Sequence, residues 1–306
     1  MSILVIGATF VDIKGFPFDN YLPTGRNAGK VEYVHGGVAR NVVEDIANIE
    51  LRPTFLSIVD DTPMGDAVVQ KLKNHKVNTD YVLTRPDGMG TWLAVFDNNG
   101  DVAGSISKRP NMYPIAELLQ EKGDEIFSQV RSVVLEIGLD KEIVKGTLAL
   151  CQKHGVKSFA LVANMSIAAE RRDLLQQFDC VICNQQEAGI LFLDDYEEKT
   201  PEEMCAILQE RIAAANIPAM VVTMGAAGAV YANLQGENGV CPARNVQVKD
   251  TTGAGDSFCA GVAIGMTYGK TMAEAVQIGT TLAASVITSS ENVCPRFRPE
   301  ELGIHI

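Results

Sequence analysis

The sequence predicts an α/β protein in which helices cover both faces of a mostly parallel sheet, with a second, smaller β-sheet beside it. Three observations carry this prediction. Apolar runs of strand length alternate with helical patterns along most of the 306 residues. These runs are apolar at successive positions, which is typical of strands buried on both faces. Two stretches, about 13–35 and about 86–110, lack helical periodicity and contain β-like runs instead.

The strands and helices of the large sheet follow one another in regular alternation. Strands are expected at residues 3–8, 54–59, 132–137, 158–162, 180–183 and 219–223. Helices are expected at residues 38–49, 64–76, 141–154, 185–193 and 201–215. The last helix has the clearest start, because Thr200 can cap it, Pro201 suits its first position and Glu203 completes a capping box.

The small sheet is expected from β-like runs at 30–35, 91–97 and 102–108, the last two joined by a turn that contains Asn-Asn-Gly. A small sheet beside an α/β core could be a lid over a site. It could equally be a dimer surface, because exposed sheet edges seek partners. We expect one domain over 1–306, with a lid inserted from about 13–35 and 86–110 and a homodimer formed through that lid.

The composition argues against nucleic-acid and membrane partners. The net charge is −12 without a basic run, so a phosphate backbone would be repelled overall. No apolar run approaches the ~18 to 20 residues of a membrane span. The first residues lack the basic and apolar regions of a secretory signal. The seven cysteines lie mostly in apolar segments, which suits reduced thiols in the cytosol, and we expect a cytoplasmic protein.

The most informative segment is Asp250-Thr-Thr-Gly-Ala-Gly-Asp256, which joins a β-like stretch to an apolar helical pattern. Small residues before a helix leave backbone N–H groups uncovered, and the helix dipole adds partial positive charge. This helix start therefore suits a phosphoryl group. Asp256, in the first turn, could be a capping acid with a purely structural role. It could also be the carboxylate that accepts the hydroxyl proton in a kinase reaction.

Four segments match a known family. The segment from Asp250 to Phe258 resembles the C-terminal signature of the ribokinase-like, or PfkB, carbohydrate kinases. Gly36-Gly-Val-Ala-Arg-Asn41 resembles their N-terminal motif, Asn184-Gln-Gln-Glu187 is similar to their N-x-x-E, and Thr223-Met-Gly-Ala-Ala-Gly228 resembles their nucleotide-binding segment. The resemblance implies a Rossmann-like, ribokinase-like core with a β lid, and ATP-dependent phosphorylation of a hydroxyl with ATP and Mg²⁺.

The resemblance also implies roles for matching positions. The base would be Asp256, and the anion hole would be the backbone amides of Gly253, Ala254 and Gly255. The acceptor would be bound by Asp12, Gly36, Gly37 and Asn41. The nucleotide site would be lined by Thr223, Gly225 and Gly228, with Asn184 beside the ATP phosphates and Glu187 holding Mg²⁺ through water. Asp250 and Thr252 match positions that help several members hold a monovalent cation, usually K⁺.

The sequence departs from the family pattern in two places. Residues 163–166 lack the Asp-Pro that many members carry after the corresponding strand. Residues 289–295 lack the commoner glycine-bearing form, which argues against the monovalent cation.

For the acceptor, the segment 27–30 and Arg40 look most like those of pseudouridine and other nucleoside kinases. Trp92 and Phe96, on one strand face, could stack on a base or pack within the lid or a dimer. Arg109 and its neighbour Lys108 could meet an anionic acceptor or simply be solvated.

We favour a nucleoside, pseudouridine first, with a free ribose- or fructose-type sugar as the alternative. A non-catalytic sugar or nucleoside sensor is the other class considered. It would need neither Asp256 nor the glycine-rich helix start, and the sequence retains both.

Overall fold

The computed structural model describes residues 2–162, 168–170 and 172–305. Over these residues the larger sheet has nine strands in the order β13-β12-β11-β10-β9-β8-β1-β4-β5, parallel from β11 to β5 and antiparallel at β12 and β13. Their bounds are β1 Ser2–Ile6, β4 Thr54–Val59, β5 Asn78–Thr84, β8 Val130–Glu136, β9 Lys157–Leu161, β10 Cys180–Asn184, β11 Ala219–Thr223, β12 Ala229–Asn233 and β13 Asn238–Cys241.

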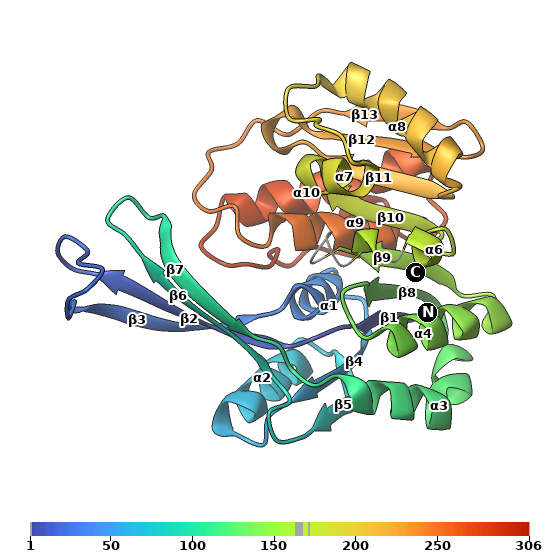
Figure 1. Cartoon of the computed structure of the whole chain (residues 1–306). Helices are drawn as coiled ribbons and strands as arrows, with labels where there is room; N and C mark the ends of the chain where they lie inside the picture. Colours follow the sequence, from blue (N-terminus) through green and yellow to red (C-terminus); the bar gives the residue numbers. More distant parts are fainter. Residues whose placement is uncertain (1, 163–167, 171, 306) are drawn as a thin grey trace.

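Helices cover both faces of this sheet (Figure 1). One face carries α1 Val38–Asn48, α2 Pro63–Asn74, α9 Ala254–Thr267 and α10 Met272–Ile287. The other carries α3 Tyr113–Phe127, α4 Lys141–His154, α6 Arg172–Leu175, α7 Gln185–Phe192 and α8 Pro201–Ala215. Alternate strand residues supply the two cores: Leu4 and Ile6 pack on one side, Ile3 and Val5 on the other. The predicted α/β class is therefore confirmed.

All six predicted strands and all five predicted helices of this layer are present. The capping box at Thr200 is also found, since its hydroxyl accepts from Glu203 N at 3.3 Å and Glu203 Oε2 accepts from Thr200 N at 2.9 Å. The sequence did not predict β5, β12, β13, α3, α6 or α10. The edge strands were missed because their half-exposed residues lack the long apolar run that marks the central strands.

The predicted small sheet is present as a separate four-stranded sheet in the order β3-β2-β6-β7, projecting from one side of the core (Figure 1). Its strands are β2 Phe10–Pro17, β3 Gly29–Gly36, β6 Gly90–Phe96 and β7 Val102–Lys108. β2 had not been predicted as a strand, and it begins three residues before the expected insertion.

The register of the small sheet separates two rows of side chains. Asp12 pairs with Trp92, which pairs with Ser107, so these three share one face. Ile13, Leu93 and Ile106 form the adjacent row on the opposite face, extended onto β3 by Tyr33. The first row lines a cavity and the second is largely exposed, at 41% for Leu93, 61% for Tyr33 and 71% for Ile106.

Two sequence-based expectations concern the rest of the chain. Every cysteine is free and buried, as predicted from the apolar segments around them. Within the described ranges, the helices are too short or too polar to cross a bilayer. The segment 163–166, which departs from the family pattern, lies outside the described residues.

Candidate active site

Two cavities meet at the segment that leads into α9. The first, of about 660 Å³, is bounded by Thr252, Gly253 and Asp256, and the second, of about 570 Å³, by Ala254 and Gly255. The glycine-rich helix start is thus a wall shared by the two cavities. Both volumes fall in the range of small-molecule sites.

The backbone at Gly253 can be formed only by a residue without a side chain. Its φ is +82°, and an added Cβ would lie 2.0 Å from the carbonyl oxygen of Asn292. Ala254 then begins the 14-residue helix α9, with no side chain capping its first turn. Uncapped N–H groups at a helix start are a favourable place for an anion.

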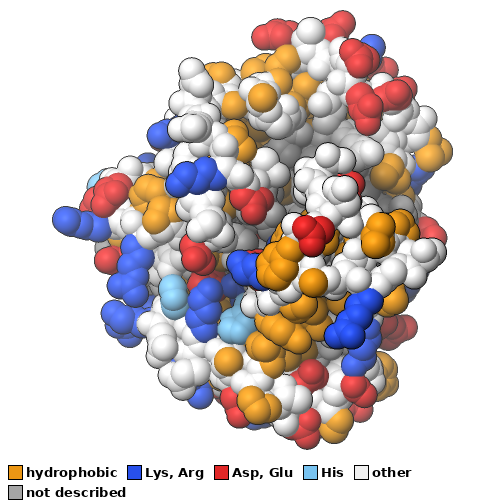
Figure 2. All heavy atoms as spheres, turned by 90° about the vertical axis from the view of Figure 1, so that its left-hand side faces the viewer, with side chains coloured by type: hydrophobic (Ala, Val, Ile, Leu, Met, Phe, Trp, Pro, Cys, Tyr) orange, Lys and Arg blue, Asp and Glu red, His pale blue; other side chains and the backbone are white. Residues whose placement is uncertain are grey.

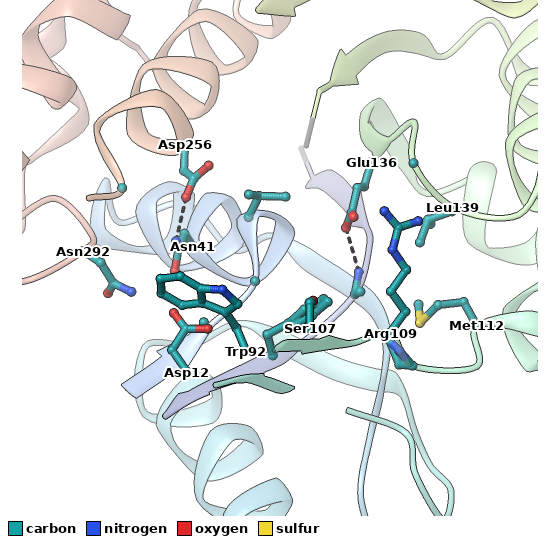
Figure 3. A pocket seen from close by; sticks show the side chains of 18 of the residues that line it. Asp12, Asn41, Trp92, Ser107, Arg109, Met112, Glu136, Leu139, Asp256 and Asn292 are labelled. Carbon is teal, nitrogen blue, oxygen red and sulfur yellow. Dashed lines mark hydrogen bonds between the residues drawn. The ribbon is translucent and has the colours of Figure 1, made fainter. Parts of the chain in front are cut away.

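Asp256 lies in the first turn of α9 and turns toward the first cavity (Figure 3). It does not cap the helix, because its Oδ2 accepts a hydrogen bond of 2.6 Å from Asn41 Nδ2. The structural alternative left open by the sequence is therefore not the one adopted. Burial raises the pKa of Asp256 to about 7, and the charges of Glu136 and Glu187 act in the same direction. The Asn41 hydrogen bond and the charge of Arg40 oppose this rise.

The four predicted acceptor residues line the same cavity as Asp256: Asp12, Gly36, Gly37 and Asn41. An added Cβ at Gly36 would lie 2.7 Å from Asp12 Oδ1, so a larger residue there would displace the Asp12 carboxylate. Gly37 has a φ of +97° and precedes α1. Asn41 is 95% buried, and its Oδ1 has no hydrogen-bond partner among the described residues. Burial also raises the pKa of Asp12.

The second cavity holds three of the four residues predicted for the nucleotide: Thr223, Gly225 and Gly228. Thr223 ends β11, and the 3₁₀ turn Gly225–Ala227 follows it. The opposite wall comes from α10, through Ala283, Ala284 and Ile287, which the sequence reading missed. The lining is mostly apolar or small, which suits a flat base more than an extended charge.

Asn184 and Glu187 border neither cavity directly. They form a capping box at the start of α7, in which Asn184 Oδ1 accepts from Glu187 N and Glu187 Oε2 accepts from Asn184 N, both at 2.8 Å. Burial raises the pKa of Glu187. The charge of Glu187 raises the pKa of Asp256, so Glu187 lies near the start of α9. Its hydrogen bonds, however, cap α7.

Asp250 and Thr252 form a tight turn just before the helix. Thr252 N donates to Asp250 Oδ1 at 2.8 Å, and this bond holds the pKa of Asp250 below its ordinary value. Thr252 borders the first cavity, whereas Asp250 is exposed and borders neither.

Glu136 and Asn292 also border the first cavity, although the sequence analysis gave them no role (Figure 3). Arg109, considered there for an anionic acceptor or as a solvated side chain, borders the same cavity. Glu136 could have been found, because it ends a predicted strand at the sheet edge where α/β proteins bind ligands. Asn292 gave no signal in the sequence. Its side chain donates to the His35 carbonyl at 3.1 Å, close to the acceptor glycines.

Arg40 does not reach the cavity. It is fully buried, and it donates to Glu44 Oε2 at 2.6 Å and to the carbonyl oxygens of His35 and Gly36. Arg40 therefore holds the end of β3, at His35 and Gly36, from the side away from the cavity.

An α/β core, a small sheet facing the cleft and an anion-suited helix start between two cavities are the features of a sugar or nucleoside kinase. The chain belongs to the pfkB family of carbohydrate kinases, whose model matches residues 1–294. Its members are phosphotransferases with hydroxyl acceptors, and this chain is an enzyme of that class. Ribokinase-like kinases use ATP.

The proteins similar in sequence to this chain include nucleoside kinases. The chain is 36% identical over 293 residues to guanosine-inosine kinase from Exiguobacterium acetylicum, covering 95% of this chain and 96% of that one. It is 25% identical to pseudouridine kinase from Escherichia coli, covering 90% and 87%. Ribokinase from Arabidopsis thaliana, solved with ribose and ATP, has the same fold, with a TM-score of 0.86, 21% identity and coverage of 98% and 97%.

Proposed function

We propose that this protein transfers the γ-phosphoryl group of ATP to a hydroxyl of a nucleoside. ATP would occupy the second cavity, and the nucleoside the first. Asp256 would remove the hydroxyl proton, and the amides of Gly253, Ala254 and Gly255 would stabilise the charge on the transferring group. Asp12, Gly36, Gly37 and Asn41 would orient the acceptor. Thr223, Gly225 and Gly228 would hold the nucleotide, with Asn184 nearby.

The shared wall between the cavities is the observation that supports this proposal most. A phosphoryl group passing between two bound substrates must cross that wall, where Asp256 faces one side and the helix amides start. A pKa of about 7 lets Asp256 accept a proton near neutral pH. A sensor would need no base at this point.

A nucleoside is favoured over a free sugar by the size of the first cavity and by its named relatives. About 660 Å³ exceeds what a pentose needs, and Trp92 from the small sheet offers a ring to stack against. The relative of 36% identity is named for guanosine and inosine, and a second is named for pseudouridine. Pseudouridine, favoured from the sequence, therefore shares its place with the 6-oxopurine nucleosides, and a ribose- or fructose-type sugar is the alternative.

The residues present fit Mg²⁺ held largely by ATP and water. Within the described part of the chain, no three His, Cys, Asp or Glu side chains gather into a metal site. Mg²⁺ commonly uses one or two carboxylates with waters and phosphates. Glu187 would serve through a water, because Oε2 is committed to Asn184 N and Oε1 is not. Bound Mg²⁺ would neutralise charge on the ATP phosphates.

A monovalent cation such as K⁺ would be placed by Asp250 and Thr252. The depressed pKa of Asp250 keeps its carboxylate charged, which favours a cation beside it. We propose Asp250 and Thr252 as its protein ligands and expect a bound cation to stabilise the loop before α9.

The small sheet would act as a lid and as the contact between two copies in a cytoplasmic homodimer. Its inner row borders the acceptor cavity, so closure would exclude water from the reaction. Its outer row is apolar and exposed, and Figure 2 shows hydrophobic side chains gathered on this side of the molecule. Such a patch on a soluble protein marks an interaction surface.

The function is tested by measuring ADP formation with ATP, Mg²⁺ and a panel of acceptors: guanosine, inosine, pseudouridine, uridine, adenosine, ribose and fructose. We expect turnover with at least one nucleoside, at a kcat/KM well above that for either sugar. We also expect little ATP hydrolysis without an acceptor, because an open lid leaves the site incomplete. Turnover with sugars alone would overturn the nucleoside proposal, and fast uncoupled hydrolysis would overturn the lid.

A further inference from the structure

The acceptor cavity has a second polar end that phosphoryl transfer does not use. Asp256, Asn41 and Asp12 gather on one side of it, while Glu136 and Arg109 lie on the other (Figure 3). A hydroxyl positioned at Asp256 would leave the second pair without a ligand unless the substrate reached across the cavity.

Glu136 is a buried carboxylate with one uncommitted oxygen. It ends β8 and is only 9% exposed. Its Oε2 accepts from Ala8 N at 2.9 Å, whereas no donor among the described residues bonds Oε1. Burial raises its pKa to about 6, so it is mainly ionised at pH 7. A buried charge with an unused oxygen is costly unless a ligand supplies a donor.

Arg109 provides the opposite charge without touching Glu136. It follows β7, where the small sheet joins the core, and borders the same cavity. Its charge lowers the pKa of Glu136, yet within the described chain neither an ion pair nor a hydrogen bond engages its guanidinium. The space between the two groups can therefore take a ligand that donates to one and accepts from the other.

We propose that Glu136 and Arg109 form a base subsite that reads a lactam, the ring N–H beside a carbonyl found in guanine, hypoxanthine and uracil. Glu136 accepts from the ring N–H, and Arg109 donates to the carbonyl oxygen. This subsite rests on the proposed nucleoside kinase function. Two relatives are named as kinases of guanosine and inosine and of pseudouridine. The bases of these three nucleosides all contain a lactam.

The same pair excludes adenosine and cytidine. Their rings present an unprotonated nitrogen where the lactam has N–H, and an amino group where it has the carbonyl. The nitrogen lone pair would face the Glu136 carboxylate, and the amino group would face the Arg109 guanidinium. Specificity would then come from repulsion of the wrong base as well as from attraction of the right one.

The test compares inosine with purine riboside, which lacks only the lactam. In the wild type we expect kcat/KM for inosine to exceed that for purine riboside and adenosine by about 10³-fold or more, because sites built to hydrogen-bond a substrate reject analogues lacking the bond. In Glu136→Gln, Ala8 N–H holds the amide oxygen, so the NH₂ group faces the cavity as a donor. Inosine should lose about 10²-fold, while purine riboside changes little and shows that the variant is folded.

Arg109→Met should reduce the preference for inosine in the same way. Lys108→Met is its matched control. It removes the same positive charge at the neighbouring position, but the Lys108 side chain pairs with Asp87 at 2.6 Å. Equal use of inosine and purine riboside by the wild type, or an unchanged preference in Glu136→Gln, would overturn the subsite while leaving a nucleoside kinase. Absence of turnover with every nucleoside, purine riboside included, would overturn the function on which the subsite rests.

Discussion

At the scale of single residues, the site brings together carboxylates that would repel one another if all were charged. Asp256 carries a pKa near 7 because it is buried and because Glu136 and Glu187 add negative potential. Asn41 and Arg40 limit that rise, the first by a hydrogen bond and the second by charge. The balance keeps the proposed base able to gain and lose a proton near neutrality.

The pH dependence of kcat/KM should follow Asp256. A base acts only when it is unprotonated, so activity should be half-maximal near pH 7, reach its plateau about one unit higher and fall towards tenfold per unit below pH 7. Below about pH 6 protonation of Glu136 would steepen the decline for inosine, because its free oxygen would become a donor. Initial rates across pH 5 to 9 at saturating Mg-ATP measure this. A flat profile through pH 7 would contradict it.

Removing the charge of Arg40 should move that profile. Arg40→Met takes away a cation that lowers the pKa of Asp256, so the acid limb should shift to higher pH. Stability should fall by about 3–5 kcal/mol, because Glu44 loses a buried partner and keeps only Lys71 and His75. Arg40→Lys keeps the charge and should keep the limb in place. The same limb in both variants would show that Arg40 acts only through packing.

At the scale of elements, the start of α9 decides what the two cavities can do. The helix must begin at Gly253 because the segment around Asn292 crosses directly over it. Ser257 Oγ then donates to the fully buried Asp45 of α1 at 2.8 Å, and Cys294 N donates to the same carboxyl at 2.6 Å. These contacts lock α9, α1 and the C-terminal segment together around Asp256.

Gly253→Ala tests this packing. The added Cβ would collide with Asn292 and force a positive φ on alanine, so we expect a loss of about 2 kcal/mol or more in the free energy of unfolding. Gly255→Ala is the matched change two residues on, with no atom within 4 Å of the new Cβ and an ordinary φ. It should alter stability by less than about 1 kcal/mol. Urea unfolding distinguishes them, and equal losses would contradict the account.

The elements also show how far the sequence could go. Central strands and their helices were predicted because long apolar runs and capping residues are local signals, as at Thr200. β2 escaped because its cleft face must carry Asp12 and Lys14, which break the apolar pattern. The glycines of the sequence motifs line both cavities, Gly36 and Gly37 the first and Gly225 and Gly228 the second. Asn292 could not be predicted, because only the tertiary path of the C-terminal segment brings it to His35.

At the scale of the whole molecule, the small sheet has two unlike faces. The inner row borders the acceptor cavity and the outer row is an exposed apolar stripe across all four strands. A second copy laid against the stripe would bury it and stiffen the lid from behind.

The homodimer is tested by Tyr33→Asp combined with Ile106→Asp. Both side chains are more than half exposed, so the substitutions should leave the fold intact and convert a dimer to a monomer. Light scattering coupled to size exclusion gives the mass directly. Lys122→Glu, an exposed change on α3, is the control and should leave the mass unchanged. A wild-type protein that is monomeric at micromolar concentration would contradict the proposal.

The central claim is that a carboxylate at the head of α9 takes the proton from the acceptor hydroxyl. The most direct measurement is single-turnover phosphoryl transfer by Asp256→Asn, in which the amide oxygen can still accept from Asn41. We predict a loss of about 10²- to 10⁴-fold in the rate, with ATP affinity nearly unchanged. A rate close to that of the wild type would contradict the claim.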